Sequence, residues 1–583
     1  MKITVYKQIT LIMILGICFL KGYAQNQTEL YMVKWPSDTV NFDVALVKNT
    51  IDYFPRIQPV FFGNLPSVFL KIPVNSFNNS VEIVLNESSN AVISKNRDIT
   101  DTITNELQLT YFTSVQNKQP YLLISFLPIY KDANGSLRKV NSFRIAVNPL
   151  RLNAIGSTIS SRTYQNNSVL SSGNWYKIAV KDEGVYKVDY SFLKKLGVDV
   201  DQLNPKNIRL YGNGGFMLPQ KNSAPRTDDL TENAIEVIGE ADGKFDSNDY
   251  LIFYNPGNTR WKLSSQQTFE HEQNVYTDSS YYFINVDKGP GKRVMQTLDP
   301  VQSPNYVSNS FDDYQLYEKD LYGLITENMK SGRDWYGEDF EFSNSRDFEF
   351  DVSGLLSTEP FLVKTKMAIR ANSNSGAKVS INNQPLYNLS TNGLPLTYET
   401  DYARPVAGVN SVVGISGNVA KVNINYGKIN STSNAWLDYI EVNFKRSYTN
   451  SKNYLRFRDK SSVANGNVSQ FNLGNLSADA KVWDVSDFTE PKSQKLTSLG
   501  GNRNFIATTS TLKEFVAFES SAFKIPDVVG KVENQDLHGL AQADFLIITA
   551  AQFFNEAKRL GELRKSTQGL SYHVVTTEQV FNE

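Results

Sequence analysis

A single cysteine constrains the fold of this chain more than any other feature. Cys18 is the only cysteine among 583 residues, and it lies in an N-terminal segment with the features of a secretory signal. That segment has a positive start at Lys2 and Lys7 and an apolar run over Ile9–Leu20. Gly22-Tyr23-Ala24 then places small residues where a signal peptidase cleaves. We therefore expect export, cleavage after residue 24 and a mature chain without disulfides, whose stability comes from packed cores.

Composition narrows the classes of partner. The net charge is -1, so no strong basic field is present to hold nucleic acid. The apolar run near the N-terminus is shorter than the roughly 20 residues that span a bilayer, and no later segment is apolar enough to do so. Aromatic residues make up 12% of the chain, a share that suits half-buried strands. We expect a mainly β protein with no transmembrane segment in the mature chain.

Alternating apolar residues predict strands through most of the chain. Tyr121–Tyr130 is typical of a buried strand, Asp132–Gly135 of a turn, and Phe143, Ile145 and Val147 alternate with polar neighbours, which together predict a hairpin. Further strands are predicted over Trp175–Val180, Val185–Val188, Ile208–Tyr211, Tyr250–Tyr254 and Phe515–Phe518, with a short helix that Ser191 caps and Gly197 ends. A β-sandwich is predicted from two sets of apolar residues, each on one face of its strand: Val422, Ile424 and Tyr426, and Ile440, Val442 and Phe444.

The last residues change in character. Phe545–Thr549 is a continuous apolar strand, and a helix is predicted over Gln552–Lys565. The apolar face of this helix consists of Phe553, Ala557, Leu560 and Leu563, and Gly569 ends it. A second strand follows at Tyr572–Thr576, so the order strand, helix, strand predicts a parallel unit that opens an α/β domain. We expect the sequence to stop early in that domain, which would leave Phe545, Ile547 and Val575 largely without partners.

The predicted organisation is therefore several β-sandwich-like domains in series, followed by one β-α-β unit. The intervals are 1–24 (signal), 25–150 (N-terminal β domain), 151–172 (linker), 173–300 (β-rich domain with one short helix), 301–450 (sandwich-like domain), 451–540 (β-rich segment) and 541–583 (start of the α/β domain).

Few motifs in the sequence suggest catalysis or ligand binding. Gly212-Asn213-Gly214-Gly215 follows a strand as a phosphate-binding loop would, but Pro219 blocks the helix that such a loop needs, so a tight turn is favoured. His271-Glu272 lacks the second histidine of a zinc peptidase, because position 275 is Val275. The other histidines, His538 and His573, are far apart in sequence, and the three predict no metal cluster.

An acidic stretch gives the one candidate metal site. Glu240, Asp242, Asp246 and Asp249 fall at positions three, five, nine and twelve of a calcium loop, with Gly243 at the sharp bend. Position one is Ile238, which cannot ligate. Two interpretations stay open: a calcium site, and an acidic turn between two strands.

Several short motifs share one family likeness. They are Asn174-Trp-Tyr-Lys-Ile-Ala-Val180, Gly184-Val-Tyr-Lys187, Asn204-Pro-Lys-Asn-Ile-Arg-Leu-Tyr-Gly-Asn-Gly-Gly215, Asp228-Asp-Leu-Thr-Glu-Asn233, Ser331-Gly-Arg-Asp-Trp-Tyr-Gly-Glu338, Ala435-Trp-Leu-Asp-Tyr-Ile440, Val482-Trp-Asp-Val485 and Asn534-Gln-Asp-Leu-His538. Together they resemble the gingipain-like cysteine peptidases that act as sortases of the type IX secretion system, over about residues 120–583.

The resemblance implies a protein of the outer membrane or cell surface of a Bacteroidetes-type bacterium. Such a peptidase removes the C-terminal sorting domain of secreted cargo and joins the cargo to anionic lipopolysaccharide by acyl transfer at a thiolate. Its implied partners are outer-membrane components of that system and cargo that carries sorting domains. Its peptidase domain is caspase-like, and Phe545–Glu583 would match its first strand, helix and strand.

The resemblance assigns no catalytic residue to this chain. The family's catalytic histidine and cysteine would lie beyond residue 583, so neither His538 nor His573 takes that role and the chain itself is expected to be inactive. Two other functions stay open: a non-enzymatic surface β-sandwich protein that scaffolds or binds partners, and a secreted gingipain-like protease with a long propeptide.

Overall fold

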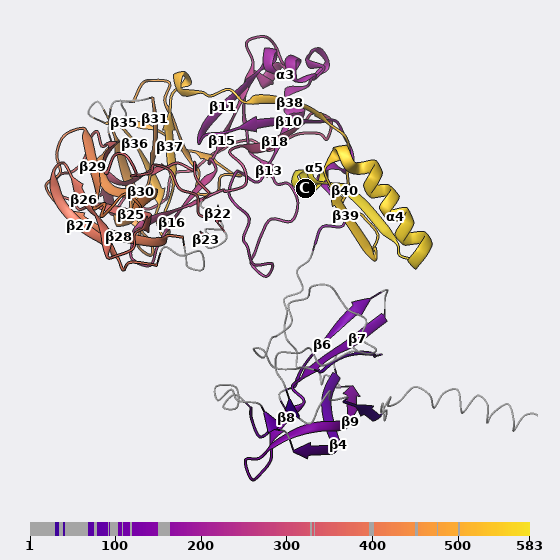
Figure 1. Ribbon diagram of the computed structural model, residues 1–583. Coiled ribbons are helices and arrows are strands. Elements are labelled where there is room, and N and C mark those ends of the chain that lie inside the picture. The colour runs from indigo at the N-terminus through magenta and orange to yellow at the C-terminus, as the bar shows by residue number, and fades with distance from the viewer. Residues whose placement is uncertain are drawn as a thin grey trace, which may run out of the picture. The chain divides into compact units, whose positions relative to one another are not determined.

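The computed structural model consists of two compact units. One comprises 1–163 with 541–580, and the other 164–540 with 581–583. The described residues are 30–33, 39–40, 68–74, 79–90, 92–93, 103–107, 109–116, 119–149, 164–323, 325–326, 329–330, 333–395, 402–448, 453–474, 476–499 and 502–583. The expected signal, including Cys18, lies outside these residues. Strands predominate (Figure 1), which confirms a mainly β fold.

The N-terminal β region consists of two small sheets around one core. Their orders are β1-β9-β4, with β8 on β9, and β3-β7-β6, and a parallel pair joins β2 to β5. The strands are β1 (Leu30–Met32), β2 (Thr39–Val40), β3 (Val68–Pro73), β4 (Asn79–Asn90), β5 (Val92–Ile93), β6 (Leu109–Gln116), β7 (Gln119–Phe126), β8 (Ile129–Lys131) and β9 (Leu137–Pro149).

The predicted hairpin in this region is confirmed, with one change. Strands β8 and β9 pair in antiparallel fashion, and Phe143, Ile145 and Val147 are buried on one face. The stretch predicted as one strand over Tyr121–Tyr130 is two strands, however, because β7 ends before Pro128 and β8 begins after it. Proline has no N–H to donate to a sheet, so a strand tends to break there.

The second unit begins with two sheets and a short helix, whose apolar face packs into the core that the sheets share. Their orders are β13-β12-β18-β10-β38 and β11-β15-β14. The elements are β10 (Trp175–Val180), β11 (Gly184–Asp189), α3 (Tyr190–Leu196), β12 (Arg209–Tyr211), β13 (Glu232–Asn233), β14 (Glu236–Ile238), β15 (Tyr250–Asn255), the separate hairpin β16 (Thr259–Leu263) and β17 (Phe269–Gln273), β18 (Ser280–Asn285) and β38 (Asp527–Val532).

Helix α3 forms where the sequence predicts a helix, but another residue caps it. The Asp189 carboxylate accepts a hydrogen bond from Phe192 N, whereas Ser191 lies inside the first turn. An aspartate just before the helix satisfies an amide that the helix itself leaves free. Gly197 ends the helix with φ of 95°, as predicted. Upstream, Ser168 and Leu170 are buried, so this part of the interval predicted as a linker packs into the unit, whereas residues 164–167 are exposed.

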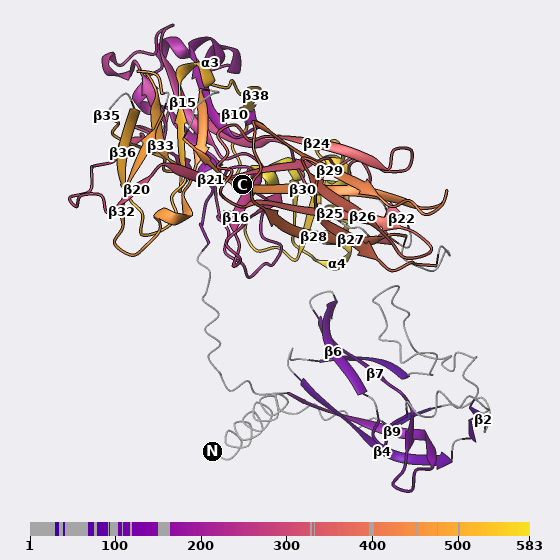
Figure 2. The same cartoon turned by 90° about the vertical axis from the view of Figure 1, so that its left-hand side faces the viewer.

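A β-sandwich follows and confirms the predicted pattern. Its sheets are β21-β30-β25-β28 and β24-β29-β26-β27 (Figure 2), and the six apolar residues named from the sequence all lie in the core between them. The strands are β21 (Ser310–Glu318), β24 (Ser345–Asp351), β25 (Phe361–Arg370), β26 (Ser375–Ile381), β27 (Gln384–Thr391), β28 (Arg404–Val412), β29 (Val419–Tyr426) and β30 (Asn434–Ser447); the small hairpin β22 (Ile325–Thr326) and β23 (Met329–Lys330) stands apart.

Two further sheets complete this unit, in the orders β19-β34-β33-β37-β31 and β20-β32-β36-β35. The strands are β19 (Met295–Gln296), β20 (Tyr306–Ser308), β31 (Tyr454–Phe457), β32 (Val468–Leu473), β33 (Lys481–Asp484), β34 (Lys492–Ser493), β35 (Thr497–Leu499), β36 (Asn502–Thr508) and β37 (Phe515–Phe518). Strand β38 pairs with β10, and β20 pairs with β32. Each pairing joins two intervals that were predicted from the sequence as separate domains.

The last elements form the predicted parallel unit. They are β39 (Phe545–Thr549), α4 (Phe554–Gln568), β40 (Tyr572–Thr576) and α5 (Thr577–Asn582), with β39 and β40 paired in parallel. Gly569 ends α4 with φ of 66°. Among the described residues, no helix has both the length and the apolar character needed to cross a membrane.

The side chains of this unit differ from prediction in two ways. Helix α4 buries Ala557 and Gly561, while the residues predicted as its packed face, Phe553, Leu560 and Leu563, are exposed, because the close approach to Tyr572 leaves room only for small residues. Val575 was expected to lack partners but is buried, and the exposed strand residues are Leu546 and Ile548.

Candidate functional site

The four residues of the predicted calcium loop do not converge in the structure. Glu240 pairs with Arg293, whose Nε lies 2.8 Å from its Oε2. The Asp242 carboxylate accepts from Lys244 N at 3.0 Å, and that of Asp249 accepts from Asp246 N at 2.7 Å. These contacts are those of an acidic turn.

Within the part of the chain that the structure describes, no group of three or more His, Cys, Asp or Glu side chains is placed to hold a metal ion. Gly212–Gly215 likewise forms a structural turn, in which Asn213 Nδ2 donates to Asp229 O and its Oδ1 accepts from Thr231 N.

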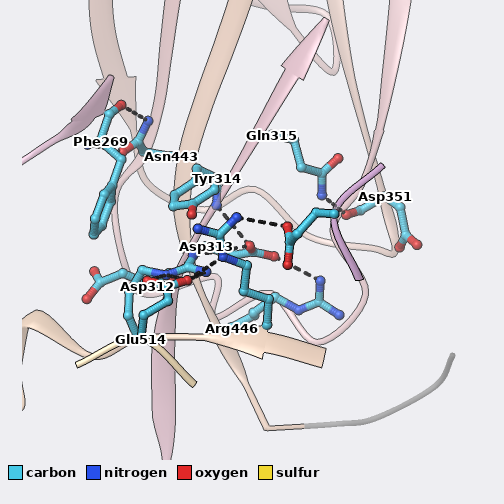
Figure 3. Close-up of polar contacts among 12 residues, drawn as sticks. Phe269, Asp312, Asp313, Tyr314, Gln315, Asp351, Asn443, Arg446 and Glu514 are labelled. Atoms are coloured by element: carbon cyan, nitrogen blue, oxygen red, sulfur yellow. Dashed lines mark hydrogen bonds and ion pairs between the residues drawn. The ribbon is translucent and has the colours of Figure 1, made fainter. Parts of the chain in front are cut away.

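A cluster of buried arginine and carboxylate side chains lies instead elsewhere in the second unit, and Figure 3 labels Asp313, Arg446 and Glu514 of this arginine cluster. Arg456 lies on β31 and Arg458 directly follows the strand, two positions further along, so both side chains leave the same face of the chain. Glu514 accepts from both, with 2.5 Å from its Oε1 to Arg456 Nε and to Arg458 Nη2. Glu183, in the turn before β11, lies 2.8 Å from Arg456 Nη1.

The arginine cluster extends to strands β21 and β30. The Asp313 carboxylate lies 3.0 Å from Arg446 Nη1 and 3.9 Å from Arg458 Nη1. Arg458 also donates to Asp312 O at 3.1 Å, and its guanidinium lies over the Tyr314 ring at 4.1 Å. The cluster therefore ties the β10–β18 region, the sandwich and the β31–β37 region together through one set of charges.

Burial and charge oppose one another in the arginine cluster. Burial disfavours the ionised form of Glu514, but the guanidinium groups of Arg456 and Arg458 outweigh it and lower its pKa. For Asp313 the balance is reversed, since burial raises its pKa against the pull of Arg458 and Arg446. Because removing one partner of a buried pair leaves a charge without compensation, the arrangement holds its geometry strongly.

A second cluster joins the β16–β17 hairpin to the outer face of the sandwich. His271 on β17 lies between two carboxylates: its Nδ1 contacts Glu441, and its Nε2 lies 3.2 Å from Glu318 Oε2. Asn443 clamps the same hairpin, because its side chain accepts from Phe269 N at 2.6 Å and donates to Phe269 O at 3.0 Å. Burial alone would lower the pKa of His271, but the two glutamates outweigh it and raise the pKa to about 9.

The other two histidines have separate surroundings. His538 Nδ1 lies 2.8 Å from Glu583 Oε2, and its Nε2 lies 3.6 Å from Asp228 Oδ1. Burial opposes protonation of His538, but Glu583 and Asp229 outweigh it and raise its pKa. His573 on β40 lies with its Nε2 2.9 Å from Ala541 O, a contact within its own unit.

The sequence pattern missed both charge clusters, although one signal was present. In Tyr454–Phe457 and the residue after it, Arg456 and Arg458 alternate with Leu455 and Phe457, which are buried. Arginines at alternate positions of a strand share a face, and when the other face enters a core they need carboxylate partners if they too are buried. The partners Glu183 and Glu514 are too far away in sequence to be identified without the fold.

The geometry of the arginine cluster and the His271 cluster indicates that they hold the sheets of the second unit together. In these clusters the buried carboxylates Glu514 and Glu441 are engaged by arginine or by histidine, and their partners come from several sheets of the second unit.

Comparison with solved structures shows which known structures this chain resembles. The chain is similar to the crystal structure of dimeric latent PorU from Porphyromonas gingivalis, with a TM-score of 0.62 and 25% sequence identity. The match covers 72% of this chain and 38% of that one, so this chain spans well under half of the PorU length. The resemblance identified from sequence motifs is thereby confirmed as a structural one.

Other likenesses are slight. A carbohydrate-binding CBM36-1 domain of a xylanase from the hindgut metagenome of Trinervitermes trinervoides has a TM-score of 0.16 and 9% identity, covering 22% of this chain and 96% of its own. At such a score it supports no inference about this chain. No protein-family model matches the sequence, and no curated protein matches it.

Proposed function

We propose that this chain is the β-rich region and first α/β elements of a PorU-like cysteine peptidase of the type IX secretion system. The observation that carries the proposal is the structural match to PorU over 72% of the chain, at a TM-score of 0.62. The order of β39, α4 and β40 agrees with it, because a parallel strand–helix–strand unit is how an α/β peptidase domain begins.

In this proposal the β regions serve as a rigid platform at the outer membrane or cell surface. The Arg456–Arg458 cluster and the His271 cluster support that role, since they fix several sheets of the second unit against one another. The reaction proposed for the complete protein is removal of the C-terminal sorting domain from cargo, followed by attachment of the cargo to anionic lipopolysaccharide. The thiolate and histidine for that acyl transfer are proposed to lie outside residues 1–583.

The test uses the gene in its own bacterium. Deleting it should leave secreted cargo with its sorting domain uncleaved, detected as C-terminal peptides by mass spectrometry of the surface fraction. The full gene should restore cleavage, and a version in which its peptidase cysteine is replaced by alanine should be made but should not. Cargo that is trimmed normally in the deletion strain would reject the sortase proposal.

The same strains separate the two alternatives. Restoration by the cysteine-to-alanine version would show a non-enzymatic scaffold. Loss of a secreted proteolytic activity with normal trimming of cargo would show a secreted protease with a long propeptide.

A further inference from the structure

One end of the β-sandwich carries a hollow that none of the charge clusters involves. It has a volume of about 690 Å³, within the range of about 300–1,000 Å³ typical of small-ligand sites. The hollow lies where the first residues of β26 and β28 meet the last residues of β27. Its lining residues are Asn374, Ser375, Ser390, Thr391, Asn392, Arg404, Pro405 and Val406.

The hollow has a clear structural origin. Strands β27 and β28 belong to different sheets, and they approach closely at Gly408, where a Cβ would stand 2.7 Å from side-chain atoms of Leu389 and of Tyr387. That glycine lets the two sheet edges close along the seam. At the neighbouring end of the seam, the small side chains of Ser390 and Thr391 leave the space open.

The loops at this end share an unusual composition. The stretches 371–376, 390–393 and 429–435 contain Asn, Ser and Thr at most positions and no Asp or Glu. Hydroxyl and amide groups both donate and accept hydrogen bonds, so they match the hydroxyl groups of a sugar. Pro405 and Val406 add apolar surface at one wall, on which the C–H face of a sugar ring can rest.

Arg404 gives the hollow its charge. It is half-buried, and among the described residues its guanidinium has no hydrogen bond, ion pair or ring contact. Its neighbour Arg370 shows the contrast, because it donates to Tyr402 O at 2.9 Å and lies over the Tyr402 ring at 4.2 Å. A guanidinium offers a planar fork of donors that fits a carboxylate or phosphate in bidentate fashion.

We propose that this end of the sandwich binds an anionic saccharide, with Arg404 holding its carboxylate or phosphate and the amide and hydroxyl side chains holding its hydroxyl groups. The volume exceeds what a lone phosphate fills. The described residues of the lining include no aromatic ring on which a nucleobase could stack, which disfavours single-stranded nucleic acid. The site is separate from the proposed peptidase function and does not depend on it.

The experiment is calorimetric titration of the purified protein with two acidic probes, trigalacturonate and mannose 6-phosphate. Their neutral counterparts are methyl-esterified trigalacturonate and mannose, and inorganic phosphate tests the anion alone. We expect at least one acidic probe to bind, its neutral counterpart to bind on the order of tenfold more weakly, and Arg404→Gln to weaken the acidic probe by a similar factor, since one charge-assisted bidentate contact is lost.

Two variants make the result decisive. Lys378 is an exposed residue of β26 in the same sandwich and lies outside the hollow. Lys378→Gln therefore removes one positive charge and should leave binding unchanged. Ser390→Tyr keeps Arg404 but fills the space, and should abolish binding with an unaltered melting curve.

Three results would overturn the proposal. They are no binding of either acidic probe at about 10 mM, equal weakening by Arg404→Gln and Lys378→Gln, and inorganic phosphate binding as tightly as the acidic saccharides.

Discussion

At the scale of single residues, Arg458 is the side chain whose removal should cost most. Its side chain is 1% exposed, and it serves Glu514 and Asp313 together. Arg458→Met should lower the free energy of unfolding of the second unit by about 3–5 kcal/mol, because Glu514 and Asp313 each lose one of their two guanidinium partners in a buried site. Urea unfolding followed by fluorescence measures this.

The matched control is Lys262→Gln, which breaks the exposed pair with Glu272 in the same unit and should change stability by less than about 1 kcal/mol. Equal losses in Arg458→Met and Lys262→Gln would mean that the arginine cluster adds no more than a surface pair.

The acidic turn leads to a second prediction at this scale. Glu240 is held by Arg293, and the carboxylates of Asp242 and Asp249 accept from backbone amides, so calcium should leave the melting temperature unchanged. Melting curves with calcium and with chelator should coincide. A rise with calcium that disappears in Asp242→Ala would restore the calcium interpretation, since a ligand that binds only the folded state stabilises it.

At the scale of elements, the β16–β17 hairpin should respond to pH through His271. Its pKa is raised in the folded state to about 9 from the ordinary histidine value of 6.5. The stabilisation is therefore complete below about pH 6.5 and is lost as the pH rises through 9, a loss of roughly 3 kcal/mol for this shift.

His271→Gln should remove that pH dependence between pH 6.5 and 9. Unfolding measured across this range provides the comparison. A slope equal in wild type and variant would show that another group titrates there.

The strand–helix–strand unit should be the segment that proteases cut first among the ordered elements from residue 164 on. Leu546, Ile548, Leu560 and Leu563 are exposed, and a two-stranded parallel sheet with a helix on one face has little core. Limited trypsin digestion followed by mass spectrometry should show early cuts at Arg559, Arg564 and Lys565, while the sandwich remains intact. Early cuts in β25 or β30 would contradict this.

Elements were predictable where one local signal decides. Alternation placed β29 and β30 with the correct buried faces, and Gly197 and Gly569 ended their helices as expected. The misses have local competitors: Asp189 outcompeted Ser191 as a cap, and Pro128 divided a strand. The sequence placed Ala557 correctly on the buried face of α4 but missed Gly561, where a Cβ would stand 2.3 Å from the Tyr572 ring, and Leu560 and Leu563 are exposed.

At the scale of the whole molecule, the alternation of apolar and polar residues could not predict which distant strands pair. Strand β38 pairs with β10, and Glu183 meets Arg456, across more than 250 residues in each case. No periodicity encodes which distant strand supplies a partner, so the candidate clusters became visible only in the fold. The family resemblance did reach this scale, because its motifs are distributed along much of the chain and the structural match to PorU extends over 72% of it.

The last prediction concerns activity of these 583 residues on their own. Thiol acyl transfer needs a cysteine sulfur, and Cys18 is the only one in the sequence, within the segment expected to be removed on export. A serine mechanism would need a histidine free to take a proton. Two of the three histidines are held by carboxylates, His271 by Glu441 and His538 by Glu583, and His573 contacts the Ala541 carbonyl. Purified residues 25–583 should therefore not cleave a peptide that carries a sorting domain. A mock preparation from host cells that lack the gene controls for host proteases, and turnover by residues 25–583 above that background would show that these residues cleave the peptide without a cysteine.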